Sequence, residues 1–378
     1  MNNPFTYDCI IAGAGCAGLS LAVKLKEILP PQAKVLIVEQ TKHKGNDRTW
    51  CFWSKEEHPW YEKAIKKQWS SFVVKNRQEE ASYSLAPYRY NLIRSQDFYS
   101  LCLSILKTDS RFEWLYETMI SVQTMDSIAV LKTSGGEYRA GMLFNSAIRS
   151  LSLRSNQVNF IQHFKGWMIR AETPIIDEER PVFMDFSVDQ KNDCRFVYVI
   201  PFSKTEALVE YTGFSEHAWS DEEYDETLRD YVSQYLKGAP YTITETEKGQ
   251  IPMTEGVFEN PFGDKVINIG TAGGSSKPST GYTFYFIQKH IAELIQQLQT
   301  KSNPRYGIRK ARFQWYDSVL LKVLKHKLVA SDSLFVKLFR QNATIDLLDF
   351  LNEESSISQE LRIMNSVDRG KFIAAMFR

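Results

Sequence analysis

The N-terminal segment shows the clearest pattern of apolar and polar positions. Residues 7–12 form a short apolar run of the kind that makes a buried parallel strand. A glycine-rich turn follows at 13–18, and residues 19–25 have helical character. A second apolar run, residues 34–38, ends at Glu39. The pattern predicts a strand, a glycine turn, a helix and a second strand that ends in an acid.

The rest of the chain alternates strand-like and helical segments. Residues 46–70 are dense in aromatic side chains and are predicted to be loop-like. Strands are predicted at 71–75, near 83–90, over 113–145 with a hairpin turn at Gly135-Gly136, at 182–186, 195–200 and 207–212, and at 266–269. Helices are predicted at 95–107, at 221–236 with an acidic start, and from the glycine-rich stretch 270–281 to about residue 299.

The glycine turn has the spacing of a dinucleotide-binding motif, Gly13-x-Gly15-x-Ala17-Gly18. The first glycine allows the tight turn, the second lets the backbone approach a pyrophosphate, and the third permits close packing of helix on strand. Glu39, twenty-one residues after Gly18, can accept hydrogen bonds from ribose hydroxyls. FAD is favoured over NAD by the motif's position near residue 1 and by the glutamate. A glycine turn that binds nothing is the alternative.

Composition excludes several classes of protein. The 378 residues are 43% hydrophobic and carry a formal charge of +1, which fits a globular chain and disfavours a nucleic-acid binder. The five cysteines include no CxxC pair, so neither a metal site nor a disulfide scaffold is expected. The N-terminus lacks a secretory pattern, and the apolar stretch 9–23 is too short to span a bilayer. We expect a cytoplasmic protein without an obligate protein partner.

The segment 301–340 is distinctly basic. It carries ten Lys and Arg residues against Asp317 and Asp332, with apolar residues interleaved at helical spacing. This combination is typical of a segment that lies on a membrane surface. A solvated helix packed on the main body is an equal alternative.

Several stretches together resemble the flavin-dependent lycopene β-cyclases of carotenoid biosynthesis, especially the bacterial type. The stretches are the N-terminal glycine motif and residues 49–50, 90–94, 162–167, 181–185, 196–203, 207–210, 247–253 and 277–282, in the family's order. Gly270-Thr271 departs from the Gly-Asp of related aromatic hydroxylases, which argues against a standard hydroxylase.

The resemblance implies a redox-neutral chemistry. An acid protonates the terminal double bond of an acyclic carotenoid such as lycopene, and ring closure and proton loss give γ- and β-carotene. Glu210 matches the family's glutamate and interrupts an apolar strand, whereas periodicity alone predicts an outward-facing residue. Asp185 is a second candidate acid, and a salt-bridge residue is its alternative. Reduced FAD would stabilise the cation, and NAD(P)H would only keep it reduced.

The expected fold is α/β. It has a Rossmann-type FAD domain of the aromatic-hydroxylase kind, formed by residues 1–70, 91–170 and 250–300. A β-rich substrate domain comprises 71–90 and 171–249, and a helical region, for which a membrane-facing position is one alternative, covers 301–378. Besides the glycine motif and Glu39, the cofactor residues implied are Arg94, Gly270, Thr271, Gly281 and Tyr282. The expected protein is a peripherally membrane-associated cyclase. Its rivals are a flavin monooxygenase, an isoprenoid reductase and a flavin-binding scaffold without turnover.

Overall fold

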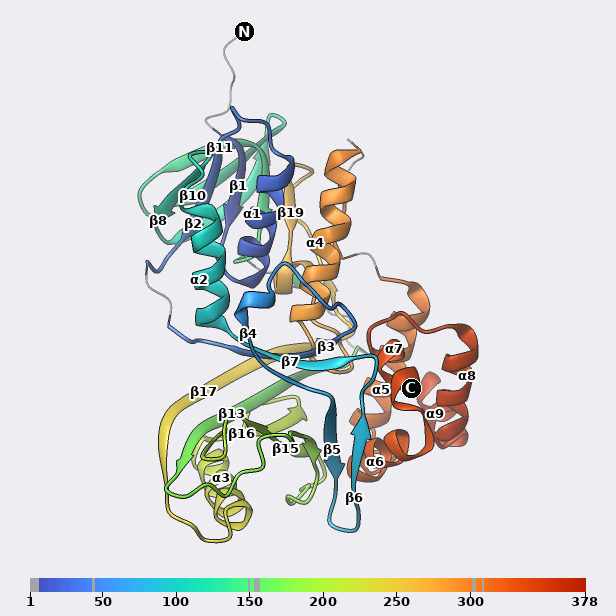
Figure 1. Cartoon of the computed structure of the whole chain (residues 1–378). Helices are drawn as coiled ribbons and strands as arrows, with labels where there is room; N and C mark the ends of the chain where they lie inside the picture. The colour runs from blue at the N-terminus through green and yellow to red at the C-terminus, as the bar shows by residue number, and fades with distance from the viewer. Residues whose placement is uncertain (1–6, 43–44, 149, 153–156, 301–303, 308) are drawn as a thin grey trace.

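The computed structural model describes residues 7–42, 45–148, 150–152, 157–300, 304–307 and 309–378. It is a mixed α/β structure (Figure 1): one sheet and its helices lie at the N-terminal end, a second sheet lies below them, and helices gather beside the second sheet. As the sequence predicts, the arrangement is α/β with a β-rich part and a C-terminal helical region.

The first sheet contains the N-terminal strand and the glycine turn. Its main order is β8-β2-β1-β11-β10-β9, and β19 also pairs with β11. The strands are β1 (Tyr7–Ala12), β2 (Val35–Glu39), β8 (Phe112–Tyr116), β9 (Met119–Met125), β10 (Ile128–Thr133), β11 (Glu137–Asn145) and β19 (Val266–Asn268). Helices α1 (Cys16–Ile28), α2 (Ser95–Leu106) and α4 (Phe284–Gln299) pack together over it, and their apolar faces share one core with β1 and β2 (Figure 1). The structure confirms the predicted strand, helix and second strand at residues 7–39, and the predicted strand at 266–269 with the helix that follows it.

The second sheet is long and curved. Its order is β17-β13-β16-β15-β14-β5-β6. The strands are β5 (Ser71–Lys75), β6 (Glu80–Ser84), β13 (Asn159–Ala171), β14 (Val182–Asp185), β15 (Cys194–Pro201), β16 (Glu206–Ser215) and β17 (Tyr241–Thr254). β13 pairs with β17 over residues 159–171 and with β16 over residues 161–170. The end of the predicted flavin segment 91–170 therefore contributes a strand to this sheet.

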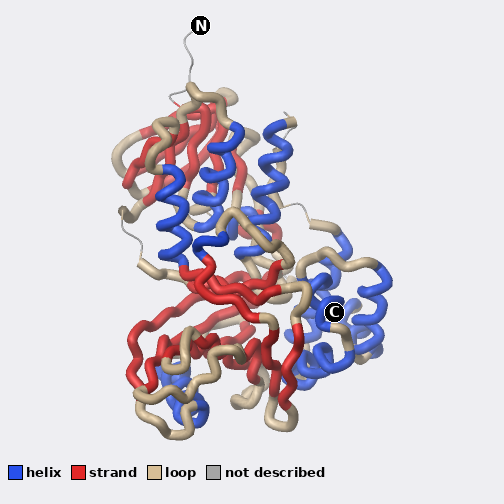
Figure 2. Tube along the Cα trace, in the orientation of Figure 1, coloured by secondary structure: helices blue, strands red, loops and turns tan. Residues whose placement is uncertain are grey.

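The region 46–70, predicted to be loop-like, is partly a small sheet between the two large ones. It contains β3 (Thr49–Ser54), the 3₁₀ turn η1 (Glu62–Ala64) and β4 (Ile65–Trp69), and both strands pair with β7 (Arg89–Arg94). The prediction failed because aromatic residues fill both faces of β3. Figure 2 shows this sheet lying across the middle of the molecule. Two short strands, β12 (Leu151–Ser152) and β18 (Val257–Phe258), form a separate pair, and η2 (Gly270–Gly273) follows β19.

Helix α3 (Asp221–Tyr235) covers one face of the second sheet. Ser220 caps it by accepting a hydrogen bond from the Glu223 N–H, and three acids in its first turn favour the positive end of the helix dipole. Strand alternation sends Val197, Val199 and Val209 to the α3 face. The residues that alternate with these valines along the strands therefore point to the opposite face of the sheet, which borders the cavities described below.

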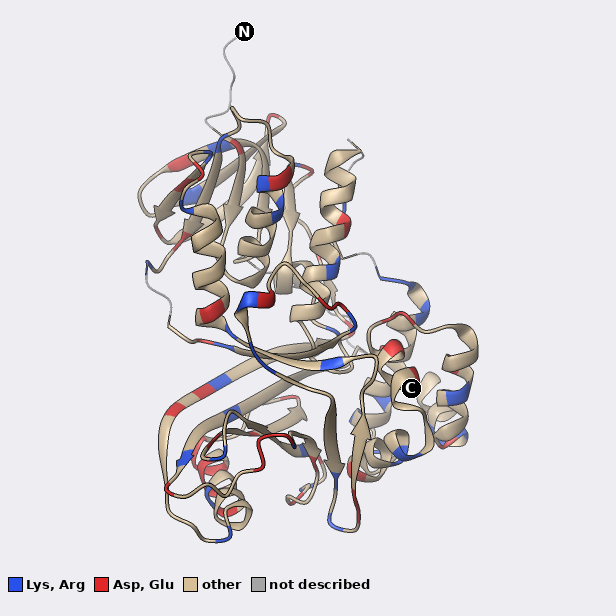
Figure 3. Ribbon diagram, viewed as in Figure 1, with Lys and Arg blue, Asp and Glu red and all other residues tan. Residues whose placement is uncertain are grey.

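The described residues of the basic segment, 304–307 and 309–340, pack against the body of the protein. It forms α5 (Ala311–Lys325) and α6 (Ser331–Gln341), which are followed by α7 (Thr344–Leu351), α8 (Ile357–Ser366) and α9 (Arg369–Met376). Its apolar residues are largely buried, and several of its cations are paired with acids: Arg312 with Glu360, Lys325 with Glu216, and Arg340 with Glu79. Figure 3 shows acids among the basic residues of these helices. The described residues of the segment therefore pack on the main body, and their contact with a membrane stays a prediction.

A buried ionic cluster joins these helices to the loop before α4. Lys277, only 2% exposed, lies 2.9 Å from Asp317 and 3.0 Å from Glu353. Arg309 pairs with the same two acids, so the cluster of four groups is neutral overall. It ties the 270–281 segment to α5 and to the turn after α7.

Candidate functional site

The glycine turn has the geometry that its spacing predicts. Gly13 has φ +104°, and a Cβ there would lie 2.4 Å from Ser146 Oγ. A Cβ on Gly18 would lie 1.9 Å from the Gly13 carbonyl oxygen, so this close packing of helix on strand requires glycine. A Cβ on Gly15 would meet nothing within 4 Å, and Gly15 and Ala17 line an open cavity at the start of α1. The helix N-terminus can therefore receive phosphates there.

Glu39 lies immediately behind this turn. It ends β2 and is 7% exposed, and its carboxylate accepts hydrogen bonds from the Ala14 N–H and the Gln40 N–H, both at 2.9 Å. The acid is thus fixed next to the glycine loop, where it can reach a ribose bound against that loop.

The segment after β19 forms the opposite wall of the same cavity. Gly270 has φ +62°, and a Cβ there would lie 2.7 Å from the Ala17 Cβ. Thr271, Gly281 and Tyr282 also line the cavity. Backbone from two distant parts of the sequence therefore encloses one space of about 390 Å³ that includes the helix N-terminus. These features fit a dinucleotide cofactor.

Two carboxyl groups face this cavity from the second sheet. Glu210 of β16 and Glu247 of β17 are both paired with Gly166 of the intervening strand β13. Because Gly166 has no side chain, the two carboxyls meet across it and hydrogen-bond to each other. A Cβ on Gly166 would lie 3.2 Å from Glu247 Cγ and 3.5 Å from Glu210 Cβ. We call these residues the carboxyl pair and their surroundings the carboxyl cavity.

The two carboxyls have different environments. Burial raises the pKa of Glu210 well above its ordinary value, and the Glu247 carboxylate raises it further. Burial also raises the pKa of Glu247, but a 2.9 Å hydrogen bond from Thr49 Oγ1 and the charges of Arg48 and Arg94 oppose this rise. These effects favour a single proton in the pair, held on Glu210.

Asp185, the other predicted acid, does not lie in this cavity. It is fully buried and accepts a 2.6 Å hydrogen bond from Tyr231 of α3. Its carboxylate also pairs with Lys75 at 3.0 Å and accepts a bond from the Ser187 N–H. The structure thus places Asp185 in the salt-bridge arrangement that was its alternative, on the α3 side of the sheet.

Arg94 lies near the carboxyl cavity but does not line it. It ends β7 and forms an ion pair with Glu245 of β17. Its charge lowers the pKa of Glu247, so it acts on the carboxyl pair through space. The sequence assigned no role to Arg48, Thr49, Gly166 or the contact between the two glutamates. The available hint for Thr49, Gly166 and Glu247 was that they lie in family-like stretches, whereas Arg48 lies in none of them.

The aromatic residues considered for a substrate tunnel separate into groups. Trp50 and Tyr198 line the carboxyl cavity, and Phe202 packs at the edge of the core next to it. Phe52 and Trp53 are buried, and Trp167 belongs to the core beside α3. Within the described residues, no group of three or more His, Cys, Asp or Glu side chains could hold a metal ion. Over the same residues, no helix is long and apolar enough to cross a membrane.

Comparison with solved structures shows the fold. A geranylgeranyl bacteriochlorophyll reductase-like protein from Thermoplasma acidophilum is 13% identical, with a TM-score of 0.66 over 98% of this chain and 99% of that chain. A flavoprotein/dehydrogenase from Cytophaga hutchinsonii is 12% identical, with a TM-score of 0.63 over 96% of this chain and all of that one.

Sequence comparison is more specific. A lycopene beta-cyclase of Pantoea ananas is 25% identical over 337 residues, which cover 85% of this chain and 83% of the relative. A lycopene beta-cyclase of Paracoccus sp. is 23% identical over 303 residues, covering 78% and 74% of the two chains. The family model described as lycopene cyclase protein matches residues 8–378. With the dinucleotide cradle and the carboxyl pair in one cavity, the match over nearly the whole length shows that this chain belongs to the lycopene cyclase protein family.

Proposed function

We propose that this protein is a lycopene β-cyclase, a redox-neutral isomerase that closes β-rings at the ends of an acyclic carotenoid. The carboxyl pair across Gly166 carries the proposal. Cyclisation needs an acid that is protonated near neutral pH, and the surroundings of Glu210 favour this form. The curated relatives named lycopene beta-cyclase support the same reaction.

Glu210 is the proposed proton donor. Its carboxyl O–H places a proton on the terminal double bond of the substrate, which leaves a tertiary carbocation. The neighbouring double bond attacks this cation, and a carbon–carbon bond closes the ring. Transfer is favoured because Glu210 becomes a carboxylate only as positive charge develops on the substrate.

The ring must then lose a proton from carbon, and the carboxyl pair can take it. Glu210, now ionised, or Glu247 accepts the proton, and the hydrogen bond between them returns it to Glu210. One proton enters and one leaves, so the product is an isomer of the substrate. Thr49 and the nearby arginine charges oppose the effect of burial on Glu247 and so favour its carboxylate form, which accepts a proton.

FAD is the proposed cofactor. The turn at Gly13, Gly15 and Gly18, with Ala17 at the helix start, would hold the pyrophosphate, and Glu39 would bind the ribose. The wall formed by Gly270, Thr271, Gly281 and Tyr282 would enclose the rest of the molecule. Reduced FAD, when bound, supplies electrostatic stabilisation of the cation, and NAD(P)H supplies the electrons that keep it reduced.

We also propose peripheral contact with a lipid surface, through α8 and α9. Several apolar side chains are exposed there: Ile357 at 57%, Leu361 at 54%, Ile373 at 51% and Phe377 at 86%. Arg369 and Lys371 lie on the same helix as Ile373, so anionic lipid would add electrostatic attraction. The substrate is a hydrocarbon that a bilayer dissolves, and such contact would bring it to the protein.

Expression in a lycopene-accumulating bacterium tests the function. We expect new pigments with β-rings and the mass of lycopene, separated by chromatography and identified by mass spectrometry. A product heavier by two hydrogens would instead indicate a reductase, and a product that contains oxygen would indicate a monooxygenase. Unchanged lycopene in cells that contain the flavin-loaded protein would contradict the proposal.

A further inference from the structure

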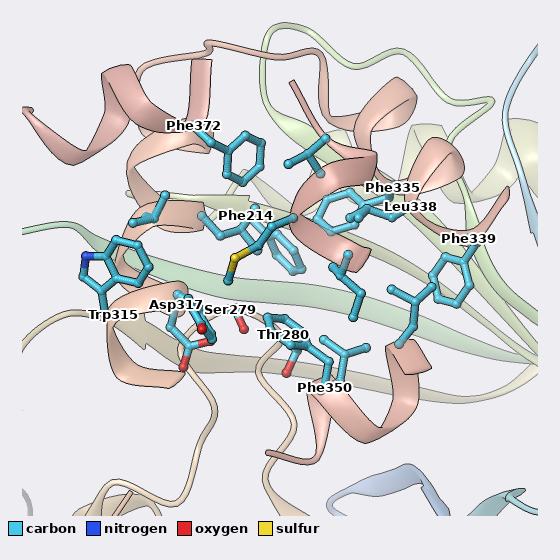
Figure 4. A pocket seen from close by; sticks show the side chains of 18 of the residues that line it. Phe214, Ser279, Thr280, Trp315, Asp317, Phe335, Leu338, Phe339, Phe350 and Phe372 are labelled. Atoms are coloured by element: carbon cyan, nitrogen blue, oxygen red, sulfur yellow. The ribbon is translucent and has the colours of Figure 1, made fainter. Parts of the chain in front are cut away.

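A second cavity lies between the second sheet and the C-terminal helices. Its volume is about 410 Å³. The sheet side is formed by residues of β14, β15 and β16, and the other side by α5 to α9. Figure 4 shows the side chains around it, of which the most relevant are Phe214, Phe335, Leu338, Phe339, Phe350 and Phe372. We call it the helix cavity.

The helix cavity adjoins the carboxyl cavity. Tyr198, Thr280 and Tyr282 line both spaces, and the Tyr198 and Tyr282 side chains hydrogen-bond to each other. The two tyrosines form a partition between the spaces: the carboxyl pair lies on one side and the helix cavity on the other. A long ligand whose end lies at Glu210 would extend past this partition into the helix cavity.

The chemistry of the helix cavity suits a hydrocarbon. Nearly all of its lining is aromatic or aliphatic. Asp317 contributes a carboxylate, but it is 3% exposed and neutralised by Lys277 and Arg309. Asn365 and Arg369 are exposed polar residues of the lining. No unpaired charge of the described lining therefore competes with an apolar ligand in the interior.

The cavity also has an exposed side. Trp315 of α5 is 47% exposed, and Ile373 and Met376 of α9 are 51% and 38% exposed, although all three line the cavity. Trp315 lies at the edge of the view in Figure 4. One side of the cavity, formed by residues of α5 and α9, therefore reaches the protein surface, on the side of the proposed lipid contact.

We infer that the helix cavity is a second substrate subsite, which holds the part of the carotenoid that is not reacting. This inference rests on the proposed function. An acyclic carotenoid has two like ends joined by a stiff conjugated chain, so one end can reach Glu210 only if the rest of the molecule is accommodated elsewhere. The adjoining apolar cavity provides that space.

The subsite has a consequence for the number of rings formed. A second cyclisation requires the monocyclic product to bind in the reverse direction, with its finished β-ring in the helix cavity. A ring is wider than an open chain end. The width of the helix cavity therefore determines whether the reaction stops at one ring or proceeds to two.

Leu338 allows this width to be changed from α6, away from the carboxyl pair. We compare Leu338→Trp, which narrows the cavity, with Leu338→Ala, which widens it, and with Leu103→Trp, on the exposed face of α2, as a matched control. The readout is the ratio of bicyclic to monocyclic product from lycopene. The ratio should be at least about tenfold lower for Leu338→Trp than for Leu338→Ala, and Leu103→Trp should match the wild type.

A shortened acyclic carotenoid, with one intact end and a truncated polyene, separates a blocked subsite from a damaged enzyme. It should not reach Leu338, so Leu338→Trp should cyclise it within about twofold of the wild-type rate. An equal loss on both substrates, or a ratio that is the same in all variants, would overturn the subsite while ring formation by the wild type would still support the proposed function. If the wild type forms no ring, both proposals fall.

Discussion

Gly166 occupies the position on β13 where two carboxyl-bearing strands face each other. Neighbouring strands place directly paired side chains about 5 Å apart, so residues two strands apart are normally separated by the side chain between them. Here that side chain is absent, and Glu210 and Glu247 hydrogen-bond across the gap. The hydrogen-bonded pair in the cavity thus depends on a residue that has no functional group.

Gly166→Ala tests this geometry. The new Cβ would lie 3.0 Å from Leu208 Cδ1 and 3.2 Å from Glu247 Cγ, so the pair must separate by a few tenths of an ångström. We expect cyclisation to fall by about tenfold or more, because small displacements at a reacting centre are costly. Thermal unfolding should change little, since Ala in a strand interior offsets the crowding by up to about 1 kcal/mol. Gly136→Ala, where a Cβ meets nothing, is the control; equal activity of both variants would contradict the role of Gly166.

The residues of the site differ in how far the sequence could predict them. The glycine turn and Glu39 are close in sequence, so their arrangement follows from local structure. Glu210 was identified through family resemblance, because an acid in an apolar strand is ambiguous by periodicity. The Glu210–Glu247 contact depends on the pairing of β13 with strands on both sides, and no local pattern encodes such pairing.

At the scale of elements, the two longest strands are among those that the sequence pattern did not predict. β13 and β17 are the longest strands described, at 13 and 14 residues, yet neither has a simple alternating pattern. β17 carries Thr, Glu and Lys side chains and is largely exposed along its first half, so it resembles a loop in composition. Tertiary pairing, rather than propensity, makes it a strand.

The ionic cluster around Lys277 links the loop before α4 to the C-terminal helices. Removing the lysine tests how much this cluster stabilises the attachment of these helices. Lys277→Met leaves Asp317 and Glu353 with Arg309 alone, so the buried cluster becomes negatively charged. Breaking a buried pair in this way costs roughly 3–5 kcal/mol. We expect a loss of unfolding free energy of at least about 2 kcal/mol, measured by chemical denaturation.

Lys289→Met provides the comparison for that measurement. Lys289 pairs with Glu354 at 3.6 Å, and both side chains are about one-third exposed. An exposed pair of this kind contributes about 0–1 kcal/mol. If Lys277→Met were no more destabilising than Lys289→Met, the cluster would not hold these helices.

At the scale of the whole molecule, the fold agrees with the sequence prediction, whereas contact of the basic segment with a membrane stays a prediction. Lys325 pairs with Glu216, and the apolar side of α5 packs into the protein. Exposed apolar residues of the C-terminal helices include Trp315 of α5 and several residues of α8 and α9. The sequence alone cannot distinguish a helix on a membrane surface from a helix packed on the protein body, because both have basic and apolar residues at helical spacing.

Vesicle binding tests this placement. Ile373→Ser with Phe377→Ser should reduce binding to vesicles of neutral and anionic phospholipid by at least about tenfold, since each side chain contributes up to roughly 1.5–3 kcal/mol when buried. Neutralising Lys322, Lys325 and Lys327 should have a smaller effect. Sedimentation with vesicles measures both. A larger loss of vesicle binding by the lysine variant would indicate that the basic segment makes the lipid contact.

The central claim is that Glu210 delivers the proton that starts cyclisation. The most direct measurement compares lycopene turnover in D₂O by the wild type and by Glu210→Gln, with flavin content matched. The carboxyl pair lines an open cavity, so the proton on Glu210 should exchange with solvent between turnovers, and the wild type should add one deuterium to each ring formed. Glu210→Gln, which keeps the shape but cannot supply the proton, should form rings about a hundredfold more slowly or worse. Rings without deuterium, or near-normal ring formation by Glu210→Gln, would contradict the account.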